Sequence, residues 1–490
     1  MSAKVSLLTG LPSSWGDIKF KELNNGDIFA AGYYGKKRNG HDELEVWVRK
    51  YGKGGELKWH TKLNLYDATL NDITAGQDGS VTIVGGTNPN VDNGRISTVK
   101  DNNRDYFIAN LDESGSLRWS NLLKGDAHDH GQKVISSNKG GYISVWANWE
   151  LVSGAWKNVP SLLKHDSNGR QLWKRRMDPI HSVSKMVGDK DDSIFVITRN
   201  NTPGNWPEML VKYDSLGNKL WSKNIANSSQ NIWAQAIDID LSGAVYVGGT
   251  TDGDLNGETK TVKGSTGYIS KYDQNGIHQW TRLLGGSGIT SASELKLQED
   301  GSILAANKRT AYWNGEGKSI SIVKFSPDGT LVGMRKIDAT NITASGQMDD
   351  VLTIDSDGSI LIETKQYYPQ DNKYSGYKRE IFLVDSIDFN QNYYSITPIV
   401  SSSNEGGEVR TNVSTTGVDA GTRLYWTLSG TGIDADDFSS GALEDSGLVK
   451  ADGTLTFAHT LAADQTTEGA ETFNIKLYSN KKRTNQVGST

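Results

Sequence analysis

The chain has 490 residues, with 54 glycines, 9 prolines, no cysteine and a net charge of −6. The negative balance argues against a general nucleic-acid-binding protein, which needs a basic surface. The lack of cysteine excludes disulfides, thiolate metal sites and cysteine nucleophiles. No stretch of about 18 consecutive apolar residues predicts a transmembrane helix.

The first residues, MSAKVSLLTGLPSSW, contain one lysine and no long apolar segment, so they do not resemble a Sec signal peptide. Within them, VSLLTG (Val5–Gly10) is similar to TRLLGG (Thr281–Gly286), which follows a tryptophan of the repeat described next. We expect this N-terminal strand to complete the last repeat, because pairing the two ends of the chain removes open sheet edges.

One pattern recurs through most of the chain: an apolar strand, an Asp-containing turn with Gly, and then Trp. Examples are LLKHDSNGRQLW and LVKYDSLGNKLW. A sixth copy has Gly333 in place of the tryptophan. The tryptophans that end the other copies are Trp59, Trp119, Trp173, Trp221 and Trp280.

A second pattern alternates with the first and consists of a short strand, a tight turn and a β-rich strand, as in IDIDLSGAVYVGG. Each pattern predicts a β-hairpin, and two hairpins make a four-stranded sheet. The second pattern occurs seven times, with turns at Gly26, Gly79, Gly141, Asp192, Gly243, Gly301 and Gly358. The sequence therefore predicts an all-β chain in which residues 1–388 form a seven-bladed β-propeller.

The segment from Ala236 to Gly288 closely resembles the bacterial beta-propeller repeat of secreted and surface proteins. The resemblance is moderate in the other copies. It implies a propeller and an extracellular or cell-surface setting. Because the first residues do not resemble a Sec signal peptide, we expect export by another route, and type I secretion fits this. The resemblance implies no single activity.

Two features of the repeat region are candidate binding sites. The loop with Asp252, Asp254 and Asn256 matches the front of an EF-hand calcium loop, but Lys263 stands where a bidentate Glu is needed, which favours a polar loop between strands. Four tryptophans fall outside the repeat position and could contact a ligand or pack between sheets. They are Trp146, Trp149, Trp156 and Trp206.

From about residue 393 to residue 490 the repeat ends, and short alternating strands such as RLYWTLSG and TFNIKLYS predict an Ig-like β-sandwich. Acidic residues occur there in three loops, and hard oxygen ligands suit Ca²⁺. The order E-G-G, D-D-F, D-x-x-x-E-G-x-E-x-F resembles the Calx-beta domain, whose matching acids bind calcium. The resemblance implies calcium ligands at Glu405, Asp436, Asp437, Asp464, Glu468 and Glu471; the alternative is ordinary solvated loop residues.

The Calx-beta family has a further strand where this sequence reaches Val487–Thr490. We therefore expect an open sheet edge that is filled by self-association, by a neighbouring chain or by further domains beyond Thr490.

The sequence favours a non-enzymatic secreted or cell-surface binding and scaffold protein with a protein or glycan partner and calcium as its cofactor. The propeller is the interaction disc, and the sandwich is a spacer or adhesion module. One alternative is a bacteriophage virion or tail-associated structural protein. A further alternative is a propeller-based carbohydrate-active enzyme, which the sequence disfavours because no convergent acid–base set stands out.

Overall fold

The computed structural model describes residues 5–7, 18–23, 25–38, 41–63, 65, 68–87, 91–92, 95–96, 104–125, 129–152, 154–177, 180–200, 207–226, 231–260, 262–284, 291–309, 319–338, 352–354, 360–369, 375–384, 392–398, 403–430, 432–450, 453–463 and 472–488. Contacts divide the chain into two compact units. One comprises residues 1–285, 289–321 and 337–387, and the other comprises residues 286–288, 322–336 and 388–490.

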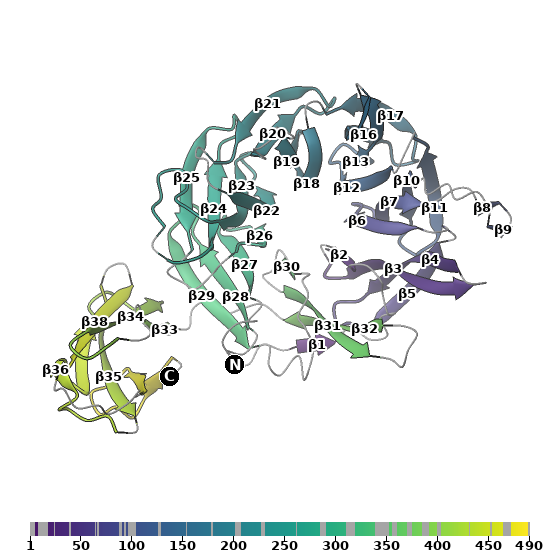
Figure 1. Cartoon of the computed structure of the whole chain (residues 1–490). Coiled ribbons are helices and arrows are strands. Elements are labelled where there is room, and N and C mark those ends of the chain that lie inside the picture. The colour runs from purple at the N-terminus through teal and green to yellow at the C-terminus, as the bar shows by residue number, and fades with distance from the viewer. Residues whose placement is uncertain are drawn as a thin grey trace. The chain divides into compact units, whose positions relative to one another are not determined.

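The region from β1 to β32 consists of four-stranded antiparallel sheets, each built from successive strands (Figure 1). The first sheet in chain order contains β2 (Lys19–Glu22), β3 (Ile28–Arg38), β4 (His41–Tyr51) and β5 (Leu57–Leu63), and the second contains β6 (Thr69–Ala75), β7 (Val81–Thr87), β10 (Asp105–Leu111) and β11 (Leu117–Leu123). The third sheet contains β12 (His130–Ser136), β13 (Tyr142–Ala147), β16 (Ser161–His165) and β17 (Gln171–Arg176). The fourth contains β18 (Ile180–Gly188), β19 (Ile194–Asn200), β20 (Glu208–Tyr213) and β21 (Lys219–Asn224). Two small hairpins extend from them, β8 (Val91–Asp92) with β9 (Arg95–Ile96), and β14 (Trp149–Val152) with β15 (Ala155–Asn158).

Three more sheets follow along the chain, and the last of them includes the N-terminal strand. They contain β22 (Ile232–Ile239), β23 (Val245–Thr251), β24 (Thr266–Tyr272) and β25 (His278–Leu283); β26 (Glu294–Leu297), β27 (Ile303–Arg309), β28 (Ser319–Phe325) and β29 (Leu331–Asp338); β30 (Leu352–Ile354), β31 (Ile360–Pro369), β32 (Ser375–Val384) and β1 (Val5–Leu7). In the last sheet β1 runs antiparallel to β32, with Val5 opposite Val384.

The first strand of each sheet lies at the centre of this arrangement (Figure 1). These inner strands contact one another in chain order, from β2 through β6, β12, β18, β22 and β26 to β30. Residues far apart in the sequence are therefore brought together along one axis.

The hairpin turns are built by an aspartate and a left-handed residue, as the sequence pattern predicts. In the β22–β23 turn, the Asp240 carboxylate accepts hydrogen bonds from the backbone N–H groups of Ser242 (2.9 Å) and Ala244 (3.0 Å). Gly243 has a φ of 84°, a conformation that glycine adopts without steric cost. Asp192 takes the same conformation, with a φ of 64°, at the equivalent place in the β18–β19 turn.

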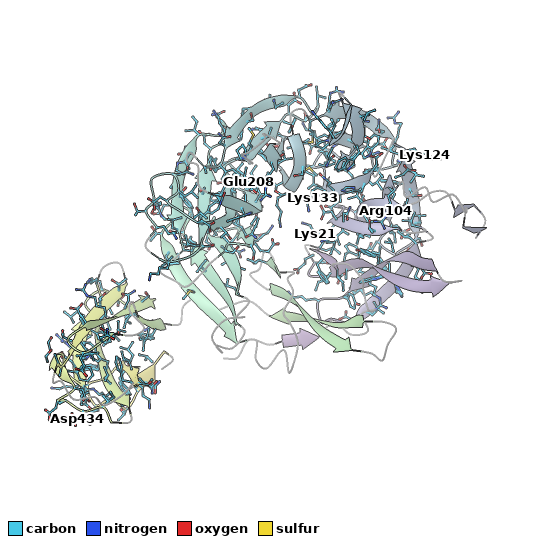
Figure 2. All side chains as sticks on the ribbon, viewed as in Figure 1. Lys21, Arg104, Lys124, Lys133, Glu208 and Asp434 are labelled. Atoms are coloured by element: carbon cyan, nitrogen blue, oxygen red, sulfur yellow. The ribbon has the colours of Figure 1, made fainter. Side chains whose placement is uncertain are left out.

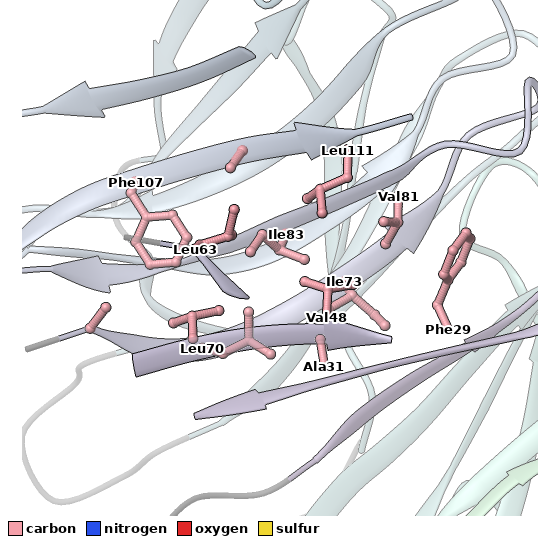
Figure 3. Close-up of a cluster of buried hydrophobic side chains, with 13 residues drawn as sticks. Phe29, Ala31, Val48, Leu63, Leu70, Ile73, Val81, Ile83, Phe107 and Leu111 are labelled. Carbon is pink, nitrogen blue, oxygen red and sulfur yellow. The ribbon is translucent and has the colours of Figure 1, made fainter. Parts of the chain in front are cut away.

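Apolar side chains fill the space between adjacent sheets. Between the sheet that contains β3 and the sheet that contains β7, the core includes Phe29, Val48, Ile73, Ile83 and Phe107 (Figure 3). Each of these strands presents every second residue to this layer, so the alternation in the sequence directly produces the core.

Repeat tryptophans lie on the outer strands and contact the turn of the following sheet. The indole N–H of Trp119 donates to the backbone oxygen of Ser167 (2.9 Å), and a Cβ added at Gly169 would collide with the Trp119 ring. Trp59 donates in the same way to the backbone oxygen of Glu113 (2.8 Å). These contacts fix one sheet to the next.

The C-terminal region has two four-stranded sheets that share one core. Trp426 and Phe457 come from different sheets and stack with ring centroids 3.9 Å apart. One sheet contains β33 (Tyr393–Pro398), β34 (Glu408–Thr416), β38 (Thr454–Leu461) and β36 (Phe438–Ser440), and the other contains β37 (Glu444–Leu448), β35 (Arg423–Gly430), β39 (Phe473–Tyr478) and β40 (Gln486–Val487).

The described residues form strands and no helix, so the predicted all-β class is confirmed. Within the same residues, no helix has the length and apolar character that crossing a membrane requires.

Candidate functional site

The inner strands carry a repeated position that faces the axis of the sheets. In the inner hairpins whose turns are described, it lies seven residues before the left-handed turn residue, which is Gly140 in the β12–β13 turn, and a second axial position follows two residues later. The charged residues at these two positions, which we name the axial cluster, are Lys19, Lys21, Asp72, Lys133, Lys185, Asp238, Glu294 and Lys296.

β-Bulges precede Asp72, Lys133 and Lys185 on their strands. The pairing of β6 with β7 shifts between Leu70 and Asp72, and that of β12 with β13 shifts between Gly131 and Lys133. The pairing of β18 with β19 shifts just before Lys185. A bulge inserts an extra residue and turns the next side chain, and bulges are frequent beside active sites.

Side chains of the cluster from different inner strands form ion pairs. The ammonium of Lys185 on β18 lies 3.3 Å from the carboxylate of Glu294 on β26, and each side chain is about one-third exposed. β22 lies between these strands and has the small Ala236 at its first axial position. The ammonium of Lys296 lies 3.8 Å from the Asp238 carboxylate.

Two of the carboxylates also join neighbouring inner strands. Asp72 accepts a hydrogen bond from the backbone N–H of Val134 on β12 (3.0 Å). Asp238 accepts one from the backbone N–H of Leu297 on β26 (2.8 Å). These acids therefore have a structural role.

Lys21 and Lys133 lie at the inner side of the ring of sheets (Figure 2). The Lys21 side chain is exposed along the axis and that of Lys133 is half-buried, but the inner strands surround both of them. Poor hydration lowers the pKa of both ammonium groups. Lys296 lowers the pKa of Lys21 further, and Lys185 and Lys19 do the same for Lys133, while the nearby carboxylates oppose the shift.

An exposed tryptophan lies on one of the inner strands. Trp233 is on β22, three residues before the first axial position, and its side chain is 38% exposed. The equivalent residues of β6 and β12 are Thr69 and His130, so this strand alone among those three carries a large aromatic ring there. The exposed ring of Trp233 offers a flat apolar surface on an inner strand.

The sequence analysis missed both the axial cluster and Trp233. The residue type at the axial position changes from sheet to sheet, with Lys, Asp, Glu or Ala, so no letter recurs. Only the fixed offset from the turn residue could have identified the set.

The predicted calcium ligands are only partly within the described residues. Glu405 lies in the turn before β34, and Asp436 and Asp437 lie in the turn before β36. The two turns are near each other, because Leu461 N–H donates to the Gly407 oxygen (2.9 Å) and Ala462 N–H donates to the Asp437 oxygen (2.8 Å). Asp464, Glu468 and Glu471 lie outside the described residues.

In the loop that resembles an EF-hand, the polar side chains have partners within the protein. Asp252 accepts a hydrogen bond from the Ser265 hydroxyl (2.6 Å), and Asp254 accepts one from the Lys260 N–H (2.8 Å). Asn256 donates to the Ile225 oxygen (2.9 Å). Across the described part of the chain, no group of three or more His, Asp or Glu side chains is arranged to hold a metal ion.

The four tryptophans proposed as ligand contacts do not form one surface. Trp146 is 6% exposed and packs against Tyr106 in the core, with the ammonium of Lys174 3.7 Å from its ring centroid. Trp149 is half-buried on β14. The side chain of Trp156 and the whole of Trp206 lie outside the described residues.

No protein-family model matches this chain, and the search of curated proteins also finds no match. Several solved structures are similar in fold. The polysaccharide lyase Uly1 is 9% identical with a TM-score of 0.48, and the match covers 78% of this chain and 92% of the lyase. A puromycin hydrolase is 10% identical with a TM-score of 0.43, over 82% of this chain and 59% of the hydrolase. A gluconolactonase from Xanthomonas campestris is 12% identical with a TM-score of 0.33, over 66% of this chain and 90% of that protein.

These findings correct the main functional prediction, a non-enzymatic secreted or surface scaffold. The similar structures include propeller-fold enzymes, among them a polysaccharide lyase and a gluconolactonase. At these identities the likeness concerns the fold alone. The prediction also depended on the lack of convergent acid–base groups, whereas the inner strands bring lysines and carboxylates together at the axis.

Proposed function

We propose that this chain is a carbohydrate-active enzyme whose reaction centre is the axial cluster. The observation that carries the proposal is the convergence of lysines and carboxylates from separate inner strands, as in the Lys185–Glu294 pair. Titratable groups whose pKa values are shifted by their surroundings are typical of acid–base sites.

The chemistry available at the axis is proton transfer. A lysine with a lowered pKa is neutral in a larger fraction of molecules near neutral pH, and the neutral amine can accept a proton from a substrate. A neighbouring charged lysine can stabilise the negative charge that develops on the substrate. Lys133 is the candidate base, and Lys21 and Lys185 are the candidate electrostatic groups.

Trp233 favours a sugar as the substrate. An exposed indole ring next to polar groups offers an apolar face for a pyranose ring and an N–H for its hydroxyls. The ring lies on the same strand as the axial residues Ala236 and Asp238.

In the test, the full chain is incubated with a panel of polysaccharides, and turnover is measured as the release of reducing ends. We expect activity on at least one polymer, and a loss of about 10²- to 10⁴-fold in Lys133→Gln, the usual contribution of one acid–base group. Lys219→Gln, on the outer strand β21, makes the same charge change at an exposed site and should retain the rate. Inactivity on the whole panel, or an equal rate in Lys133→Gln, would refute the proposal.

With this function we also propose the domain architecture and the extracellular location that the sequence predicts. The proposed propeller spans residues 1–388, with seven blades and β1 closing the last one; the pairing of Val5 with Val384 supports this. The proposed Ig-like, calcium-binding sandwich spans residues 393–490, supported by the nearness of the Glu405 and Asp437 turns. An extracellular location, where polysaccharides are encountered, remains part of the proposal.

A further inference from the structure

The axial cluster carries an excess of positive charge. Its described members are five lysines and three carboxylates, in a chain whose net charge is −6. The local balance therefore runs against that of the whole molecule.

The carboxylates of the cluster are already engaged. Glu294 pairs with Lys185, and Asp238 pairs with Lys296 while accepting the Leu297 N–H. Asp72 accepts the Val134 N–H. Among the described residues, neither Lys21 nor Lys133 has a carboxylate within ion-pair distance, although both are in the field of several charged neighbours.

Neighbouring lysines without a matched number of anions destabilise the folded chain, because poorly hydrated like charges repel one another. Such a cost is typical of functional sites, where residues are selected for a ligand and not for stability. An anionic ligand would remove the repulsion, and lysine ammonium groups bind carboxylate and sulfate groups as compact point charges.

From these observations we infer that the axial lysines bind the acidic group of a charged sugar, with Lys21 as the principal ionic contact and Lys133, the candidate base, beside it. The inference rests on the proposed function and names its substrate class as an acidic glycan. The exposed ring of Trp233 on the inner strand β22 favours a sugar over a free inorganic anion, because an exposed indole can contact a pyranose ring.

The experiment is calorimetric titration of the full chain with oligogalacturonate, a guluronate oligomer and a sulfated galactose oligomer. Each acidic ligand is compared with a neutral counterpart, the methyl ester for the uronates and the unsulfated oligomer for the third. We expect at least one acidic ligand to bind ten times or more tightly than its neutral counterpart, with an affinity that falls as salt is added. Sodium sulfate alone should bind more weakly than the acidic sugar.

Lys21→Gln and Lys133→Gln should each reduce the affinity for that ligand about tenfold or more, and Lys219→Gln should not change it. Trp233→Ala should weaken the acidic and the neutral ligand by a similar factor. The thermal midpoint of each variant is measured in parallel, and the salt dependence of the unmodified chain tests the inference independently of any variant.

The inference is overturned if no acidic ligand binds more tightly than its neutral counterpart, or if both axial lysine variants bind as the unmodified chain does. Charge-dependent binding without turnover would leave the inference standing and refute the enzymatic proposal. Turnover of neutral glycans alone, without preference for acidic ones, would overturn the inference and leave the enzymatic proposal standing.

Discussion

The surroundings of the Lys133 side chain disfavour its charged form. Burial, together with Lys185 and Lys19, holds its pKa below the model-peptide value of 10.5. Between the lowered pKa and 10.5, the unfolded chain therefore binds more protons than the folded chain at this site, and stability rises with pH in that window.

This gives a prediction for Lys133→Gln. At neutral pH the variant should be at least as stable as the unmodified chain, because glutamine removes a poorly hydrated charge. As the pH is raised towards 10.5, the free energy of unfolding of the unmodified chain should increase relative to the variant. Urea unfolding at several pH values measures the difference, with Lys219→Gln as the control. A variant that is less stable at neutral pH, with a deficit that does not depend on pH, would contradict the assignment.

Asp192 is a second residue whose pKa depends strongly on its surroundings. It lies at the left-handed turn position where the other inner hairpins in the described region have glycine, and its side chain is buried. It accepts hydrogen bonds from the Ser137 hydroxyl, the Asn138 N–H (2.8 Å) and the Lys164 ammonium (3.2 Å). Burial opposes its ionisation, but the Ser137 hydrogen bond and the charge of Lys164 outweigh burial and lower the pKa of Asp192.

Asp192→Asn should therefore destabilise the chain by about 3 kcal/mol, because it leaves the buried Lys164 without its counter-ion. The exposed neighbour Asp191 gives the matched control, and Asp191→Asn should change stability by less than about 0.5 kcal/mol. Chemical unfolding of both variants tests this prediction. Equal stability of the two would show that the Lys164–Asp192 pair contributes nothing.

At the scale of elements, the repeated outer strand and turn form the joint between sheets. Trp119 contacts Tyr142 with ring centroids 6.0 Å apart, and its N–H reaches the Ser167 oxygen of the next turn. Because the indole is half-buried, Trp119→Ala should cost about 2 to 3 kcal/mol, less than a fully buried aromatic residue.

Trp233→Ala is the comparison for this prediction, because its ring is 38% exposed and should contribute under about 1 kcal/mol to stability. The thermal midpoints of the two variants report the difference. If Trp119→Ala and Trp233→Ala had the same thermal midpoint, the contacts of the outer tryptophans would not hold adjacent sheets together.

The acidic turns of the C-terminal region give a prediction for calcium. Binding to the folded state alone stabilises it by about 2.7 kcal/mol at one hundred times the dissociation constant. Chelation should therefore lower the C-terminal melting transition and leave the larger unit unchanged. Asp436→Asn should remove the calcium response, whereas Asp445→Asn on β37 should retain it. Calorimetry with no heat of calcium binding and no thermal shift would contradict the prediction.

How much the sequence could predict differs between the elements and the site. The hairpins follow from local rules, because an Asp, a left-handed glycine and alternating apolar residues act within a few positions of one another. The axial cluster depends on seven-residue offsets in strands that are about 50 residues apart, and Lys133, Asp72 and Glu294 share no residue type. Only the ring of inner strands makes them neighbours.

At the scale of the whole molecule, repetition supplies the rigid frame and variation supplies the site. Five outer strands carry the repeat tryptophan, while inner strands change their axial residues, from Lys19 and Asp72 to Ala236 and Glu294. A frame of repeated joints can hold charged groups that oppose one another, because the stability lost at the axis is offset by the cores between sheets.

Competitive amine labelling of the full chain tests most directly whether the axial lysines form the functional site. A small acylating reagent is added in limiting amount at neutral pH, with and without the acidic oligosaccharide that binds best, and peptide mass spectrometry gives the rate at each lysine. Because the neutral amine is the nucleophile, Lys21 and Lys133 should react faster than the exposed Lys219, and the ligand should slow only the axial lysines. Slower labelling of Lys21 and Lys133 than of Lys219, unchanged by any acidic ligand, would contradict the account.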